Sequence, residues 1–189
     1  MSVDRLRRAD LITPWRGVRS DRAPTSVYEQ AHALALVLPN EAVFSHVTAA
    51  QMLELPLPRN LASSDVLHVS TPRGSPQIRR AGVVGHRTSG ALRPLVVKGL
   101  RVDHPVTVWA DLAGPLSLDD LITVGDAVVN RVPRLLPALG AEIARRQGRP
   151  GMRTARDAHD LIRVGSASAM ETKARLVFTR AGLPDALLN

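Results

Sequence analysis

Val66-Leu67-His68-Val69-Ser70, followed after a turn by Gly82-Val83-Val84-Gly85-His86-Arg87, is the stretch that decides the fold. Both runs are short, rich in β-branched residues and bounded by turn residues, which is typical of β-strands. Two further runs of this kind lie at residues 94–97 and 100–102. We expect these runs to form a small antiparallel sheet of three to four strands.

Helical patterns lie on both sides of the strands. Before them, residues 27–38 carry apolar side chains at helical spacing, and Ser45 can cap a second helix that ends at Leu55, so we expect a helical hairpin. After them, helices are predicted over residues 105–113, 117–130, 139–146, 152–164 and 169–181. Strands grouped between helices indicate the α+β class, with a helical C-terminal third.

The last predicted helix begins at a recognisable cap. In Ser168-Ala169-Met170-Glu171, the serine hydroxyl can accept from the backbone of the glutamate, and Gly182 with Pro184 ends the helix. Its apolar residues form one face. That face either packs back onto the preceding chain or requires a partner.

The chain is strongly basic, and its charge is unevenly distributed. The formal net charge is +8, and 23 of the 25 basic residues are arginine. Residues 1–22 contain six basic and three acidic residues. Residues 73–104 contain seven basic residues and one acidic residue, and residues 131–163 contain eight basic and three acidic residues. Basic blocks of this kind are expected when one face neutralises phosphates, so double-stranded DNA is the predicted partner.

The candidate DNA-binding residues are arginines of these three blocks. The densest run, residues 145–156, places a Gly-Arg-Pro-Gly turn before a helix, which would direct backbone donors and arginines at one phosphate. Structural interpretations stay open: a solvated loop paired with Asp157 and Asp160, a charged guard on an edge strand, and a basic N-terminal arm. The full set is Arg5, Arg7, Arg8, Arg16, Arg19, Arg73, Arg79, Arg80, Arg87, Arg145, Arg146, Arg149, Arg153 and Arg156.

Composition argues against several classes of protein. Five aromatic residues are too few for the stacking platforms that bind single-stranded nucleic acid. The chain contains no cysteine, so disulfides and thiolate chemistry are excluded. No secretory signal and no apolar stretch of membrane-spanning length is visible. We expect a soluble, cytoplasmic protein with no membrane partner.

Histidines and serines offer only a weak case for a site. His68 and His86 fall on candidate strands and could face each other, but two histidines do not complete a zinc site, and spacing places no third ligand. Ser45 and His46 are neighbours in sequence, which does not make them a nucleophile and its base. We therefore expect no metal site.

Acidic residues and catalytic motifs add no chemistry. Asp119 and Asp120 belong to the first turn of a predicted helix, and Asp111 is expected to be a hydrogen-bonded polar group among apolar neighbours. The sequence contains no Gly-x-Ser-x-Gly motif, Walker loop or dinucleotide fingerprint. We expect neither a catalytic residue nor a cofactor.

The segment from Gly165 to Asp185 resembles the junction in a family of bacterial proteins with two parts. The front part of that family is similar to the AbiEi abortive-infection antitoxins, and its back part is similar to the very-short-patch-repair endonucleases. The likeness extends through residues 33–50, 55–58, 83–87, 99–102 and 109–113, and covers most of the chain from Trp15 to Pro184. The shared motifs are structural rather than catalytic.

The resemblance implies a division into three parts. Residues 1–27 are a basic arm that is similar to the remnant of a winged helix, and residues 28–164 form an AbiEi-like α+β domain. Residues 165–189 resemble the first helix of an endonuclease-like domain, truncated before the nuclease core. Metal-assisted cleavage needs several carboxylates, and only Glu171 matches the family's acidic residues, where its capping role already explains it.

The first functional hypothesis is a non-enzymatic, duplex-DNA-binding regulator of the AbiEi antitoxin type, acting as a homodimer. By the resemblance, such a protein represses its own promoter and opposes a separately encoded toxin. Two alternatives stay open. One is the truncated front part of an endonuclease-like protein, which is either inactive on its own or positions a separately encoded nuclease core. The other is a protein-interaction module that docks through its last helix.

Overall fold

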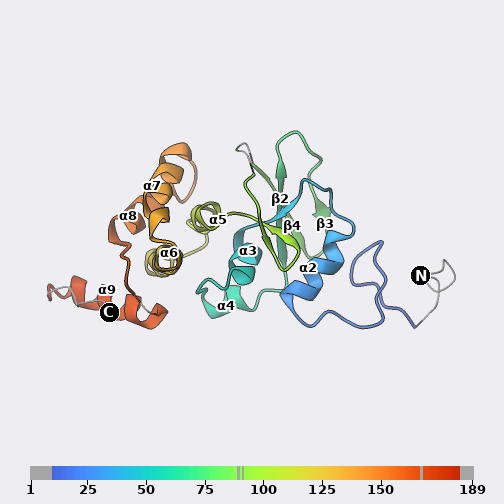
Figure 1. Cartoon of the computed structure of the whole chain (residues 1–189), viewed down its shortest axis with the longest axis horizontal. Helices are drawn as coiled ribbons and strands as arrows, with labels where there is room; N and C mark the ends of the chain where they lie inside the picture. Colours follow the sequence, from blue (N-terminus) through green and yellow to red (C-terminus); the bar gives the residue numbers. More distant parts are fainter. Residues whose placement is uncertain (1–9, 89, 91, 167, 184–189) are drawn as a thin grey trace.

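The computed structural model describes residues 10–88, 90, 92–166 and 168–183. Within these residues, eight α-helices and a six-stranded sheet are present, which confirms the α+β class and the helical C-terminal part. The sheet and the last four helices lie toward opposite ends of the long axis, with α3 and α5 between them (Figure 1).

The sheet is mixed rather than antiparallel, so this detail of the prediction is wrong. Its order is β3-β4-β2-β1-β6-β5, and β2 pairs with β4 in parallel, as β1 does with β6. The strands are β1 (Val43–Phe44), β2 (Leu67–Pro72), β3 (Arg79–Arg80), β4 (Val83–Thr88), β5 (Leu95–Val97) and β6 (Leu100–Val102).

The parallel pairing follows from a short hairpin that the sequence pattern does not reveal. Only two residues form β3, and Gly82, at φ 73°, turns the chain back antiparallel into β4. Because the chain reverses twice between β2 and β4, these two strands run in the same direction.

The helices match most of the predicted ranges. They are α2 (Val27–Ala35), α3 (His46–Met52), α4 (Arg59–Ala62), α5 (Pro105–Asp111), α6 (Leu118–Arg131), α7 (Leu136–Arg145), α8 (Met152–Leu161) and α9 (Ala169–Arg180), with a 3-10 turn at Pro133–Leu135. The predicted helical hairpin is interrupted by β1, although the Tyr28 hydroxyl of α2 still donates to the Met52 carbonyl of α3, 2.6 Å away.

The core joins the sheet to the helical part through α5. The Trp109 side chain is fully buried, and its Nε1 donates to the Leu121 carbonyl at 3.0 Å. Gly125 of α6 allows the Ile162 side chain to pack directly on this helix, since a Cβ at residue 125 would lie 2.3 Å from Cδ1 of Ile162. The helical part therefore packs on α5 without a gap for a larger side chain at this position.

Helix α9 packs back onto α6. The Ser168 hydroxyl accepts from the Glu171 backbone at 3.2 Å, as predicted. The buried Asp126 of α6 accepts from Thr172 and Arg175 of α9, both at 2.8 Å. This face of α9 is therefore covered by the chain itself, while Phe178 on the same helix remains exposed.

The N-terminal prediction is tested only in part. Backbone groups of Ile12 and Ser20 form an antiparallel bridge, whereas Arg5, Arg7 and Arg8 lie outside the described residues. The three-part division of the chain stays a prediction. No helix among the described residues has both the length and the apolar character needed to cross a membrane.

Candidate functional site

Three histidines from distant parts of the chain meet on one face of the sheet. His68 and His86 project from β2 and β4 on the same side, because the register pairs Ser70 with His86. Nδ1 of His68 is 3.0 Å from Nε2 of His86, so the two rings do face each other. His46, at the start of α3, stacks on His86 with ring centroids 3.6 Å apart. We call these three residues the histidine cluster.

The backbone of His46 adopts a strained conformation. Its φ is 51°, in the left-handed region, where a residue with a side chain costs on the order of 1–3 kcal/mol. The preceding residue holds it there, since the Ser45 backbone N–H donates to the His68 carbonyl at 3.0 Å and the Ser45 carbonyl accepts from Ala49 at 3.1 Å. The start of α3 is thus tied to β2.

A chain of polar contacts runs from the sheet to the helical part. The Ser70 hydroxyl donates to Ser45 Oγ at 2.8 Å, and Ser45 Oγ lies 3.0 Å from Nδ1 of His46. The same nitrogen is 3.4 Å from Oδ2 of Asp111, whose Oδ1 accepts from Arg146 at 2.5 Å. The predicted hydrogen-bonded role of Asp111 is confirmed.

This arrangement is not a serine–histidine–aspartate triad. A triad needs the serine and the carboxylate on opposite nitrogens of the imidazole. Here Ser45 and Asp111 both approach Nδ1 of His46. Ser45 is also fully buried, so a substrate has no access to its hydroxyl.

Burial keeps the histidines neutral. Desolvation, reinforced by the neighbouring rings and Arg146, lowers the pKa of His46 to about 3. Burial and the His68 ring lower the pKa of His86 to about 4, and burial lowers the pKa of His68 as well. At pH 7 each ring therefore carries one proton and one free lone pair.

Two residues of the cluster, His46 and His86, line a cleft of about 170 Å³ between the sheet and the helical part. We call it the histidine cleft. Its lining residues are His46, Ser70, His86, Arg87, Thr88, Asp103, Thr107, Asp111, Arg146 and Arg149. An adjoining hollow of about 320 Å³ shares Thr107 and is lined by Arg93 and Arg145, among others. Polar and charged groups thus dominate the histidine cleft, whereas the adjoining hollow also has apolar lining residues such as Val106 and Ala138.

The structure brings four of the predicted arginines to this region. Arg87 follows His86 on β4, whereas Arg145, Arg146 and Arg149 come from the end of α7 and the loop after it. Arg146 is buried and ion-paired with Asp111, so it serves mainly to join the parts. Arg145 pairs with Glu142, whereas Arg87 is exposed and pairs with no carboxylate among the described residues.

The remaining described arginines of the predicted set lie elsewhere. Arg16, Arg79 and Arg80 line a separate hollow beside Trp15, where Arg80 donates to the Arg16 carbonyl at 2.9 Å. The others are exposed: Arg19 donates to Thr13, and Arg73, Arg153 and Arg156 form no ion pair with a described residue. The alternative in which the last two pair with Asp157 and Asp160 is therefore wrong for the described residues.

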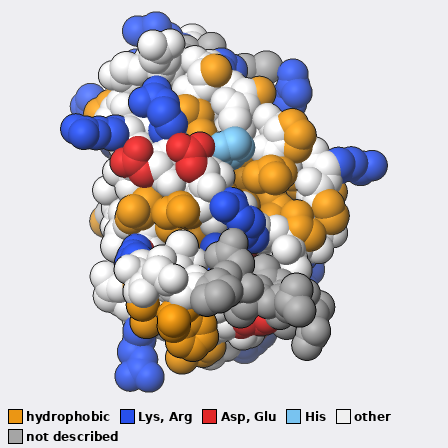
Figure 2. Space-filling model, turned by 90° about the vertical axis from the view of Figure 1, so that its left-hand side faces the viewer, with side chains coloured by type: hydrophobic (Ala, Val, Ile, Leu, Met, Phe, Trp, Pro, Cys, Tyr) orange, Lys and Arg blue, Asp and Glu red, His pale blue; other side chains and the backbone are white. Residues whose placement is uncertain are grey.

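The described residues on the outer face of the helical part form no continuous basic patch. In Figure 2, its lysine and arginine side chains are separated by apolar, acidic and uncharged groups. At the histidine cleft, by contrast, basic residues from different blocks do meet, namely Arg87 and Arg149.

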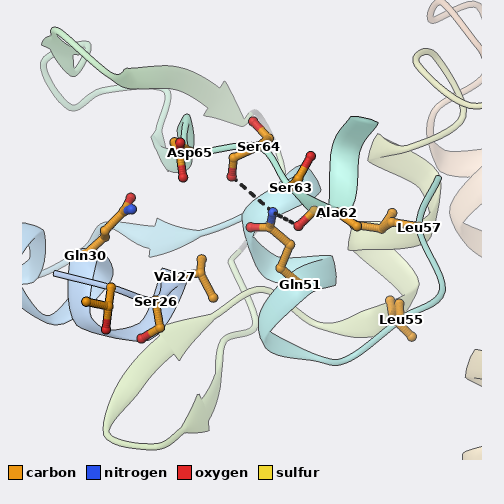
Figure 3. Close-up of a pocket in the computed structure, with 11 residues that line it drawn as sticks. Ser26, Val27, Gln30, Gln51, Leu55, Leu57, Ala62, Ser63, Ser64 and Asp65 are labelled. Carbon is orange, nitrogen blue, oxygen red and sulfur yellow. Dashed lines mark hydrogen bonds between the residues drawn. The ribbon is translucent and has the colours of Figure 1, made fainter. Parts of the chain in front are cut away.

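Another hollow, of about 380 Å³, is lined by residues of α2, of α3 and of the segment that leads into β2. Figure 3 shows Gln51 reaching from α3 toward the segment that leads into β2. Its Nε2 donates to the carbonyls of Leu61, Ala62 and Ser64, at 3.0, 3.1 and 3.2 Å. Gln51 thus holds two chain segments together.

Sequence reasoning missed His46 as the third member of the cluster. Residues 46, 68 and 86 follow no metal-site spacing, because a helix start and two parallel strands bring them together. The only local signal was that all three lie at or beside predicted elements.

Comparison with known proteins supports the fold and nothing more specific. No family model matches the chain, and no curated protein matches it. The crystal structure of the RV2827C protein from Mycobacterium tuberculosis is similar, with a TM-score of 0.50 at 17% identity. The match covers 87% of this chain and 64% of that one, so this chain spans less than two thirds of the length of the RV2827C protein.

Proposed function

We propose that the protein is a non-enzymatic, duplex-DNA-binding regulator that binds backbone phosphates at the opening of the histidine cleft. The supporting observation is that Arg87 and Arg149, from separate basic blocks of the sequence, line one cleft. The regulator role of the AbiEi antitoxin type, with a homodimer and a separately encoded toxin, is the biological setting that the sequence resemblance suggests for this activity.

The start of α8 supports the proposal. Gly151 caps the helix at φ 81° without a side-chain hydrogen bond, and the first turn contains no acidic residue. Helix N-termini attract anions, and Arg153 in this first turn adds a positive charge. The loop that carries Arg149 therefore ends at a helix start suited to a phosphate.

The exposed arginines on either side extend the basic surface. Arg156 follows on α8, and Arg93 lines the adjoining hollow. Neither pairs with a described carboxylate. Arginines without an acidic partner can replace the counterions of a duplex, which makes affinity depend on salt.

The test is the salt dependence of binding to a labelled duplex of mixed sequence, followed by fluorescence anisotropy. If about six phosphates are neutralised, log affinity should fall against log salt with a slope near −5. The double variant Arg87→Ala/Arg149→Ala should flatten that slope by about 2 units.

The matched control is Arg101→Ala/Arg134→Ala, which removes the same charge from two exposed arginines that do not line the cleft. Its slope should change by less than about 0.5. Equal flattening by both double variants would contradict a contact at the cleft, and absence of binding at low salt would overturn DNA binding itself.

A further inference from the structure

We propose that His46, His68 and His86 form a binding site for one divalent transition-metal ion of the zinc class. The ligand nitrogens of these side chains all lie within 4.8 Å of one another. Nitrogen ligands of a tetrahedral zinc ion, each about 2.0–2.1 Å from the metal, lie roughly 3.3–3.4 Å apart. The three imidazoles are therefore close to the spacing that one shared ion requires.

The cluster is built on elements that fix two of the ligands. His68 and His86 belong to paired strands, and their facing nitrogens are already 3.0 Å apart. His46 is nearly parallel to His86, with 12° between the ring planes. Its ring must turn so that a nitrogen lone pair points at the ion, and the histidine cleft, which both rings line, gives it room.

Outer contacts prepare His46 for this role. With Nδ1 protonated, the ring can donate to Ser45 Oγ or to Asp111, which leaves Nε2 free for a metal. A carboxylate or hydroxyl behind a ligating histidine is the usual outer partner in zinc sites. Arg146 holds Asp111 in place at 2.5 Å.

The donor set selects the kind of metal. Neutral imidazoles suit zinc, cobalt, nickel and copper, whereas magnesium and calcium prefer oxygen ligands. Three protein ligands leave a fourth position, which faces the cleft for a water or an anionic oxygen.

The competing explanation is a structural one. Three neutral rings can stack and share a hydrogen bond between His68 and His86 without any ion. The two explanations differ in one measurable property, which is whether zinc binds to the folded protein at these residues.

The experiment titrates chelator-treated protein without an affinity tag with ZnCl₂, using calorimetry and thermal unfolding. We expect one ion per chain with a Kd of micromolar order or tighter. A hundredfold excess over Kd should raise Tm by roughly 5 °C or more. A titration without saturable binding, or with no rise in Tm, would overturn the proposal.

Variants locate the ion. His68→Gln and His86→Gln should each weaken zinc binding by at least about a hundredfold, whereas His32→Gln, on the exposed face of α2, should bind as the parent does. Far-UV circular dichroism checks that each metal-free variant is folded. Undiminished binding by the first two variants would place the ion elsewhere and contradict the site.

Nuclear magnetic resonance of the unaltered protein removes the dependence on variants. Of the six histidines, three imidazole sets should shift on addition of one equivalent of zinc. Shifts of a different set would overturn the assignment. All these measurements omit DNA, so failure of the metal site and failure of the proposed DNA binding are distinguishable.

Discussion

Asp103 is a buried carboxyl beside the histidine cleft, and its surroundings disfavour its charge. The residue is 2% exposed. Burial raises its pKa to about 6, with Asp111 and Glu142 adding to the effect, whereas the His104 backbone N–H, 2.9 Å from Oδ1, and Arg146 oppose it. At neutral pH the folded protein therefore holds an ionised carboxylate at a free-energy cost.

Asp103→Asn should stabilise the protein at neutral pH. The pKa of this carboxyl is higher in the folded state than its ordinary value of 3.8, so the stability that its protonated form contributes is lost as pH rises from about 4 to 6. We expect the variant to gain up to about 3 kcal/mol in the free energy of unfolding at pH 7.5, and nothing at pH 4.

Urea denaturation at the two pH values measures this difference. The comparison must be between variant and parent, because the lowered pKa values of His46 and His86 make both proteins less stable as pH falls below about 6. A gain that is equal at pH 4 and pH 7.5 would show that the Asp103 charge is not its cause.

For single residues, the sequence predicted the chemical role of a side chain better than it predicted which other side chains lie beside it. Asp111 was expected to be a hydrogen-bonded polar group, and it is. His68 and His86 were expected on strands that could bring them face to face, and they are. His46 could not be added, since its position depends on where α3 begins relative to two strands that follow later in the chain.

At the scale of elements, a buried polar cluster between α6 and α9 holds the two helices together. Asp126 accepts from the Arg163 backbone, from Thr172 and from Arg175, each at 2.8 Å. Arg175 is itself buried. Removing one partner of a buried ion pair leaves the other charge without compensation.

Asp126→Ala should lower the free energy of unfolding by about 3–5 kcal/mol. Asp119→Ala is the matched control, because it breaks an exposed ion pair between the same two helices, with Arg180, and should cost less than about 1 kcal/mol. Chemical denaturation of both variants provides the comparison. Similar losses in the free energy of unfolding would mean that burial of the ion pair does not determine its contribution to stability.

Elements with a recognisable pattern were predicted, including the three-residue strands β5 and β6, whereas the two-residue strands were not. The helix from Leu118 to Arg131 and the strand from Val83 to Thr88 fall close to their predicted ranges. Val43–Phe44 and Arg79–Arg80 are too short for any periodicity. Because these two strands decide the sheet order, an antiparallel arrangement was inferred where a mixed sheet exists.

At the scale of the whole molecule, the described residues share one continuous core, in which α5 contacts both the helical part and α3. Trp109 of α5 is fully buried in it, whereas Trp15 lies beside the N-terminal hollow. A shared core predicts that both parts unfold together.

In the Trp15→Phe variant, Trp109 is the sole tryptophan and reports on the junction of the two parts. We expect its fluorescence and the far-UV circular dichroism to give the same urea midpoint, because secondary structure is lost when the core opens. Midpoints that differ by more than experimental error would show that the sheet and the helical part unfold independently.

Gly151 has a consequence for recognition. Its φ is 81°, and a Cβ there would lie 2.7 Å from the backbone of Ala113, so the loop before α8 rests directly on the end of α5. Arg149 is therefore carried by a segment whose path is preorganised before any ligand arrives. Binding of a partner should therefore cost little entropy for ordering that loop. Charge and shape complementarity, rather than rearrangement of the loop, should then govern association.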